Sequence, residues 1–216
     1  MSDLVRWSIA VILVLLAPVV PFLLFGEWAE ARIEAWLDET LSPVSTAAIV
    51  IGALASDILL PVPSSFVSTL AGSRLGLLAG TGVNWLGMTA GASIGFALAR
   101  WLGRPLAARF TSAADLARME ALAERGGPTV LVLTRPLPVL AEASVLLLGA
   151  IGLSWRQFLP VVLLANLGLA AAYAALGYWA HEQGNLPVAL AASVVLPVLA
   201  TVVARRWLPA RQSTAN

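Results

Sequence analysis

Six apolar stretches follow one another along the chain, and each is long enough to form a helix at membrane depth. They cover residues 7–25, 43–72, 75–99, 129–155, 157–180 and 186–204. About twenty apolar residues cross a bilayer as a helix. Charged residues make up only 12% of the chain, whereas a soluble domain is nearer a quarter charged. The sequence therefore predicts an all-α, polytopic integral membrane protein with a single membrane domain over residues 1–216.

Composition excludes several kinds of chemistry. Cysteine is absent and His181 is the single histidine, which excludes disulfides, thiol chemistry, and metal sites made of Cys or of several His. The net charge of +1 gives no support for nucleic-acid binding. We expect no cofactor and no metal, and we expect that the protein is not an enzyme.

The first apolar stretch, residues 7–25, is expected to be a retained membrane helix. Arg6 precedes it, and Gly26-Glu27-Trp28 follows it where a cleaved signal peptide would have a small-x-small cleavage site.

The second and fourth stretches are different because prolines and charges interrupt them. The residues concerned are Asp57, Pro61 and Pro63 in 43–72, and Arg135, Pro136, Pro138 and Glu142 in 129–155.

A Pro-x-Pro sequence should stop a helix, since each proline lacks an N–H donor and clashes with the preceding turn. In lipid, a broken helix is tolerated only where protein or a water-filled cavity covers the freed backbone groups. We therefore predict that 43–72 and 129–155 are helical hairpins that enter the membrane and turn back. Both stretches continue into small and apolar residues and then a glycine, Gly72 or Gly149. Paired interrupted segments of this kind are typical of transporter repeats, with the binding site at the breaks.

The arginines test this arrangement, because positive residues favour the cytoplasmic side. With the N-terminus in the cytoplasm and two re-entrant hairpins, ten of the 13 basic residues, all arginines, face the cytoplasm and Arg32 faces out. The two hairpins then enter from opposite faces as an inverted repeat, and about four full spans surround them. Both termini are cytoplasmic. Interfacial amphipathic helices are expected over 27–41 and 104–127, the second one ending at Gly126-Gly127-Pro128.

Three pieces of the sequence resemble the DedA family, also called the VTT or SNARE-associated Golgi protein domain family, over a core of residues 43–180. They are Asp57 with Pro61, Pro63 and Ala71-Gly72; Gly87, Gly91 and Gly95 followed by Arg100 and Gly103-Arg104; and Arg135 and Pro138 followed by Gly149, Ser154-Trp-Arg156-Gln-Phe158 and Asn166-x-Gly168. The chain departs from many members at Ser64-Ser65, Ala92-Ser93 and Glu142. Family members resemble transporters or scramblases, some flipping undecaprenyl phosphate and others scrambling phospholipids. The resemblance implies a lipid-translocating or small-ion-coupled activity. We expect translocation of a phosphate-bearing lipid, a polyprenyl phosphate or a phospholipid, or of another small solute, at a site between the hairpin tips.

Four ionisable residues lie at the depth of the hairpins, and such residues are usually functional because each costs roughly 2.5–3.5 kcal/mol in lipid. They are Asp57, Arg74, Arg135 and Glu142. We expect Arg135 to bind a lipid phosphate through its donor fork, and Asp57 and Glu142 to take up protons or balance the arginine. The alternative is a pair of structural ion pairs, Asp57 with Arg74 and Arg135 with Glu142. Pro63 and Pro138 are expected to shape the hairpin tips beside the substrate.

Ser64, Ser65, Asn84 and Asn166 can line a polar path, although such residues more often satisfy contacts between membrane helices. Two other functions stay open. One is a protein that organises membrane lipids or other proteins without transport. The weaker one is an intramembrane hydrolase with Ser93 of Gly91-Ala-Ser93-Ile-Gly95 as nucleophile and His181 as base. Against it, Gly87, Gly91 and Gly95 recur every four residues, as in a helix-packing face.

The expected partners are membrane lipids, a lipid-phosphate substrate and protons, with homo-oligomerisation left open. Arginine and alanine are abundant, while lysine and cysteine are absent. This bias is typical of a GC-rich bacterium, and we therefore expect the protein in the bacterial inner membrane.

Overall fold

The computed structural model describes residues 41–60, 62–103, 105, 113–135, 137–186, 188–190, 192–193 and 195. Within these ranges the chain is helical and contains no strand, which confirms the all-α prediction. The helices are α3 (Pro43–Ser56), α4 (Ser64–Leu98), the π-helical segment η1 (Ala99–Gly103), α6 (Ala113–Thr134), α7 (Pro138–Ile151) and α8 (Trp155–Glu182). The predicted span 7–25 and the interfacial helix predicted at 27–41 lie outside the described residues, apart from Leu41.

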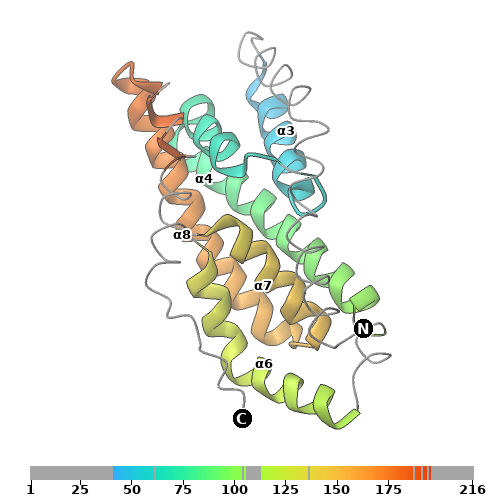
Figure 1. Ribbon diagram of the computed structural model, residues 1–216. Coiled ribbons are helices and arrows are strands. Elements are labelled where there is room, and N and C mark those ends of the chain that lie inside the picture. The colour runs from blue at the N-terminus through green and yellow to red at the C-terminus, as the bar shows by residue number, and fades with distance from the viewer. Residues whose placement is uncertain are drawn as a thin grey trace, which may run out of the picture.

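The long part of α4, which follows Gly76, runs antiparallel to α8, and α4 and α8 form the centre of the fold (Figure 1). Near one end, the backbone of Gly177 in α8 lies against Thr69 in α4. Further along, the side chains of Asn166 and Thr89 are hydrogen-bonded between the same two helices. Towards the other end, the rings of Phe96 and Phe158 stack with their centroids 3.9 Å apart. The packing of these two helices therefore sets the positions of Thr89, Asn166 and their neighbours along the molecule.

The first predicted hairpin corresponds to α3, a turn, and the start of α4. Helix α3 begins with Pro43, and the hydroxyl of the N-cap residue Ser42 accepts a 3.2 Å hydrogen bond from the Ser45 N–H. It ends at Ser56, and α4 starts after Pro63. Helix α4 then breaks at Gly76, where φ is 80° and ψ is 175°. Because glycine adopts a positive φ without a steric cost, Gly76 separates a short returning segment from the long remainder of α4.

The glycines predicted to form a packing face of α4 do pack closely, and their partner is α3 with the turn that follows it. A Cβ on Gly91 would lie 2.6 Å from the Leu54 carbonyl oxygen, and one on Gly95 would lie 2.5 Å from the Ile58 side chain. Small residues let helix backbones approach in this way. The Gly-x-Ser-x-Gly sequence thus serves helix contact here.

An alanine at Gly177 is expected to separate α4 from α8, because its Cβ would meet the Thr69 carbonyl oxygen. Overpacking of this kind costs about 1–3 kcal/mol, so the Gly177→Ala protein should melt several degrees below wild type in detergent. Gly168→Ala is the matched control on the same helix, because nothing lies within 4 Å of its added Cβ. Equal melting temperatures for the two variants would contradict this packing.

The predicted end of the interfacial helix at Gly126-Gly127-Pro128 is wrong. Helix α6 continues through Pro128 to Thr134, and Figure 1 shows it running along the lower end of the molecule before turning upward. Proline leaves the carbonyl four residues earlier without its helical donor. That carbonyl belongs to Glu124, and it accepts a 3.2 Å hydrogen bond from Gln157 Nε2 of α8. A distant side chain therefore supplies the missing donor, and the helix bends instead of ending.

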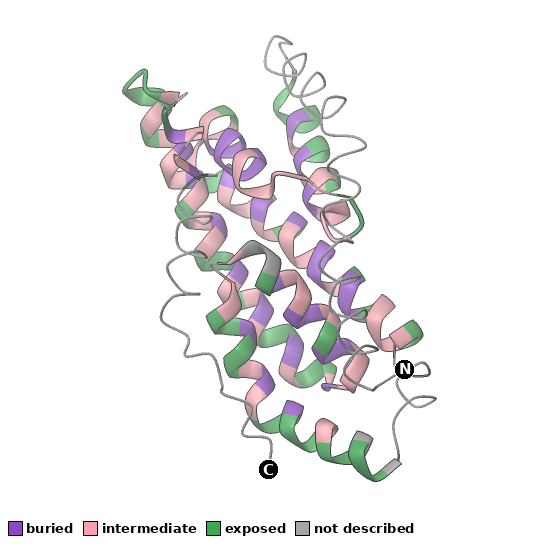
Figure 2. Cartoon of the chain, in the orientation of Figure 1, coloured by how far each residue is buried: buried purple, intermediate pink, exposed green. Residues whose placement is uncertain are grey.

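The first part of α6 is largely exposed, as expected of an interfacial helix, and Figure 2 shows this at the lower end of the molecule.

The second predicted hairpin, 129–155, corresponds to the second part of α6, the turn at Arg135 and α7. Thr134 and Ser144 join the two arms through hydroxyl groups 2.9 Å apart. The sequence therefore located both breaks at their observed positions.

Among the described helices, α8 is the one long and apolar enough to cross a membrane, and it covers the predicted span 157–180. The predicted span 75–99 forms the long part of α4, where glycines, threonines and Asn84 make the helix less apolar. Most of the predicted span 186–204 lies outside the described residues.

Candidate functional site

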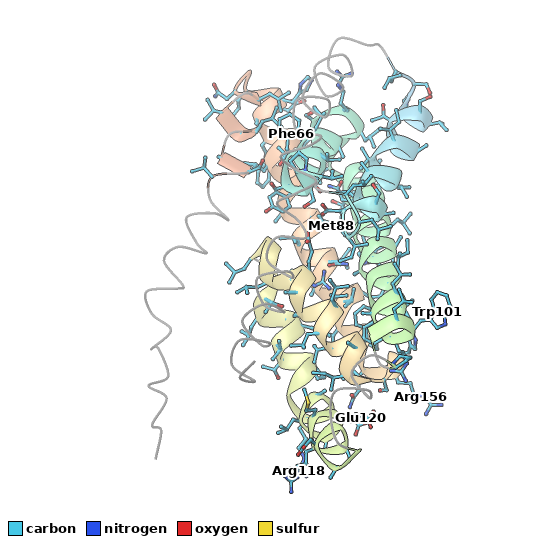
Figure 3. The ribbon with its side chains drawn as sticks, turned by 45° about the vertical axis from the view of Figure 1, so that its right-hand side comes forward. Phe66, Met88, Trp101, Arg118, Glu120 and Arg156 are labelled. Carbon is cyan, nitrogen blue, oxygen red and sulfur yellow. The ribbon has the colours of Figure 1, made fainter. Side chains whose placement is uncertain are left out.

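A cavity of about 90 Å³ lies where the two broken segments meet. Four parts of the chain line it: the α3–α4 turn and the start of α4, the middle of α4, the α6–α7 turn with α7, and α8. The lining residues are Leu54, Asp57, Ile58, Ser64, Ser65, Met88, Gly91, Ala92, Arg135, Ala141, Glu142, Val145, Asn166, Leu169 and Tyr173. Met88, labelled in Figure 3, marks the level of the cavity between the two ends of the molecule.

Arg135 reaches the cavity from the turn that follows α6. Its backbone N–H bonds to the Val132 carbonyl oxygen at 3.3 Å, and so the turn closes directly after the last helical residue. Its Nη1 donates to Asn166 Oδ1 at 2.9 Å. The other two guanidinium nitrogens, Nε and Nη2, are buried and have no hydrogen-bond partner among the described residues. One edge of a buried cation is thus left without an acceptor.

Asp57 lies in the first turn, where its Oδ1 accepts a 3.3 Å hydrogen bond from the Val62 N–H. This bond holds the carboxylate inside the turn, close to Ser64 at the start of α4. Glu142 lies one helical turn into α7, four residues after Pro138. Both Asp57 and Glu142 line the cavity. The two predicted hairpins thus each contribute one carboxylate to the same cavity.

The structure brings together three of the predicted site residues, Asp57, Arg135 and Glu142, around this cavity. In the part of the chain that the structure describes, no ion pair joins Arg135 to either acid. Arg74 is exposed on α4 and does not line the cavity. Pro63 precedes Ser64 as the N-cap of α4, and Pro138 begins α7. Both prolines therefore stand where a helix begins at the site.

Two residues near the cavity are missing from the predicted site. Tyr173 lines it from α8, and Thr89 of α4 accepts a 3.2 Å hydrogen bond from Asn166 Nδ2. Both lie inside long apolar stretches. A polar side chain within an apolar stretch is the sequence feature that could have indicated these two residues. It does not reveal which helix the side chain faces.

The structure does not bring Ser93 and His181 together. Ser93 lies one turn beyond Thr89 on α4, at or past the level of Asn166. His181 lies in the last turn of α8 and is exposed. The fifteen residues from Asn166 to His181 correspond to about 22 Å of helix. A direct proton transfer between this pair would require hydrogen-bond distance, so the geometry does not favour the hydrolase hypothesis.

The sequence matches the model of one protein family, the VTT domain, over residues 62–179, which is more than half of the 216 residues. No curated protein and no solved structure matches the chain significantly. The matched region includes the start of α4, the α6–α7 turn and nearly all of α8, and so contains most of the cavity wall. This confirms the resemblance seen in the motifs, and the chain belongs to the VTT-domain family of membrane proteins.

Proposed function

We propose that this protein moves a phosphate-bearing lipid across the bacterial inner membrane, with the phosphate group held in the cavity at Arg135. The unpartnered edge of Arg135 is the observation that carries this proposal. A buried charge without a partner is costly, and the cost falls when an anion occupies the cavity. The Nε and Nη2 groups lie on one edge of the guanidinium and match two oxygens of a phosphate.

The arrangement of the hairpins supports a pathway through this point. In Figure 1, α3 descends from the upper end of the molecule and the α6–α7 pair rises from the lower end. We propose that they enter the membrane from opposite faces, with both termini cytoplasmic as the arginine distribution indicates. Opposed broken segments with a site at their tips are a feature of transporters that expose one site to each side in turn.

The two carboxylates supply a means of coupling to protons. Asp57, Glu142 and Arg135 give the cavity two acidic groups and one basic group, so that the set has a net negative charge when both acids are ionised. Protonation of one acid makes this set neutral and removes repulsion from an incoming phosphate. A lipid anion and a proton would then enter the cavity together.

The test is translocation of a fluorescent phosphodiester lipid by purified protein in liposomes, followed by quenching of the label in the outer leaflet. We expect the label in the inner leaflet to become accessible much faster than in liposomes without protein. Accessibility equal to that of protein-free liposomes would contradict transport and favour the membrane-organising alternative. A fluorescent polyprenyl phosphate, tested in parallel, distinguishes the two lipid classes.

A further inference from the structure

We propose that Asn166 and Thr89 form a neutral positioning pair that keeps the Nε and Nη2 edge of Arg135 free of a protein acceptor, and so available to a phosphate, and prevents it from pairing with Asp57 or Glu142. This inference rests on the proposed role of Arg135. It assigns a function to a hydrogen bond between residues 77 positions apart, which joins α8 to α4.

The direction of the hydrogen-bond chain is fixed by chemistry. A guanidinium only donates, so the atom of Asn166 that faces Arg135 must be the amide oxygen. The amide nitrogen then points the other way and donates to Thr89 Oγ1. Asn166 is fully buried. Its amide oxygen accepts a hydrogen bond from Arg135, and its amide nitrogen donates one to Thr89.

The hydrogen bond of Arg135 Nη1 to Asn166 determines which edge of the guanidinium remains for a ligand. Asn166 binds Nη1, and this leaves Nε and Nη2, which share the opposite edge and can bind two oxygens at once. Without the anchor, the side chain can turn towards the carboxylates that line the same cavity. An ion pair formed in this way would occupy the guanidinium and compete with phosphate.

The neutrality of the pair is as important as its geometry. An asparagine accepts a hydrogen bond from the guanidinium without cancelling its charge. An aspartate at the same position would accept the same bond and hold the arginine equally well, but would add a negative charge beside the phosphate site. Asn166→Asp therefore separates a positioning role in anion binding from a purely structural contact.

The test compares the apparent KM for the fluorescent phosphodiester lipid, the maximal rate and the melting temperature. For Asn166→Asp, we expect a KM at least about tenfold higher than wild type, corresponding to about 1.4 kcal/mol, with no loss of melting temperature. For Thr89→Val, which removes the acceptor of Asn166, we expect a rise in KM of about threefold. Thr89→Ser should restore the wild-type KM.

Thr81→Val is the matched control, because the Thr81 hydroxyl donates to the Leu77 carbonyl oxygen of its own helix and does not line the cavity. It should leave the KM unchanged. A wild-type KM in folded Asn166→Asp and Thr89→Val proteins would overturn the positioning pair, provided that Arg135→Ala abolishes transport. If Arg135→Ala also transports normally, the proposed function itself fails.

Discussion

Replacing Arg135 by alanine is expected to lower lipid translocation at least about 100-fold. Hydrogen bonds to a charged group contribute roughly 1.5–3 kcal/mol each, and the Nε and Nη2 edge can make two of them to a phosphate. Loss of both, at 1.4 kcal/mol for each factor of ten, corresponds to about 100-fold or more. The measurement is the initial rate of translocation of the fluorescent phosphodiester lipid in liposomes with equal amounts of folded protein.

Arg135→Lys makes this test more specific. A lysine keeps the positive charge but has no planar fork, and so it should retain only a small part of the activity. Arg118→Ala is the matched control, since Arg118 lies on the exposed part of α6 with an 80% exposed side chain. It should transport at the wild-type rate. Wild-type rates in folded Arg135→Ala would show that this guanidinium does not bind the transported group.

The sequence predicted the two breaks because local chemistry determines them. Pro63 is the N-cap of α4 and Pro138 is the first residue of α7, and at both positions a missing N–H has no helical partner to lose. Pro128 shows the limit of this reasoning. Its effect depends on Gln157, whose side chain bonds to the Glu124 carbonyl from another helix. A local pattern contains no information about such a donor, and so the predicted helix end was wrong.

The same distinction applies to the site. Charges inside apolar segments are unusual enough that Asp57, Arg135 and Glu142 could be identified from the sequence, and all three line one cavity. Their mutual arrangement could not be predicted. The predicted alternative joined Arg135 to Glu142, whereas the structure joins it to Asn166 through a 2.9 Å hydrogen bond. Which partner an arginine takes depends on how α8 packs against the α6–α7 turn, and that contact links distant parts of the chain.

This choice of partner has a consequence for the charge of the cavity. Because Asn166 is neutral, it leaves the charges of Arg135, Asp57 and Glu142 to be balanced by mobile species, namely protons and a bound anion. Among the residues that the structure describes, the ionisable ones that line the cavity are these three and Tyr173, whose phenol is uncharged at neutral pH. Proton binding to the carboxylates and phosphate binding to Arg135 are therefore expected to favour one another.

Burial in an apolar site raises the pKa of a carboxyl group by up to about 3–5 units, into the range between about 6 and 8. Lipid translocation is therefore expected to become faster, by roughly tenfold, as the pH is lowered from about 8 to about 6, because a protonated carboxylate no longer repels the phosphate. A phosphodiester lipid keeps its charge over this range, so the effect would arise in the protein. In the double variant Asp57→Asn, Glu142→Gln, the rate should vary less than about twofold between the same pH values. The control Asp115→Asn, Glu124→Gln, with both changes on the exposed part of α6, should keep the wild-type profile. An unchanged profile in the first double variant would place the proton-sensitive group elsewhere and leave the two acids a purely structural role.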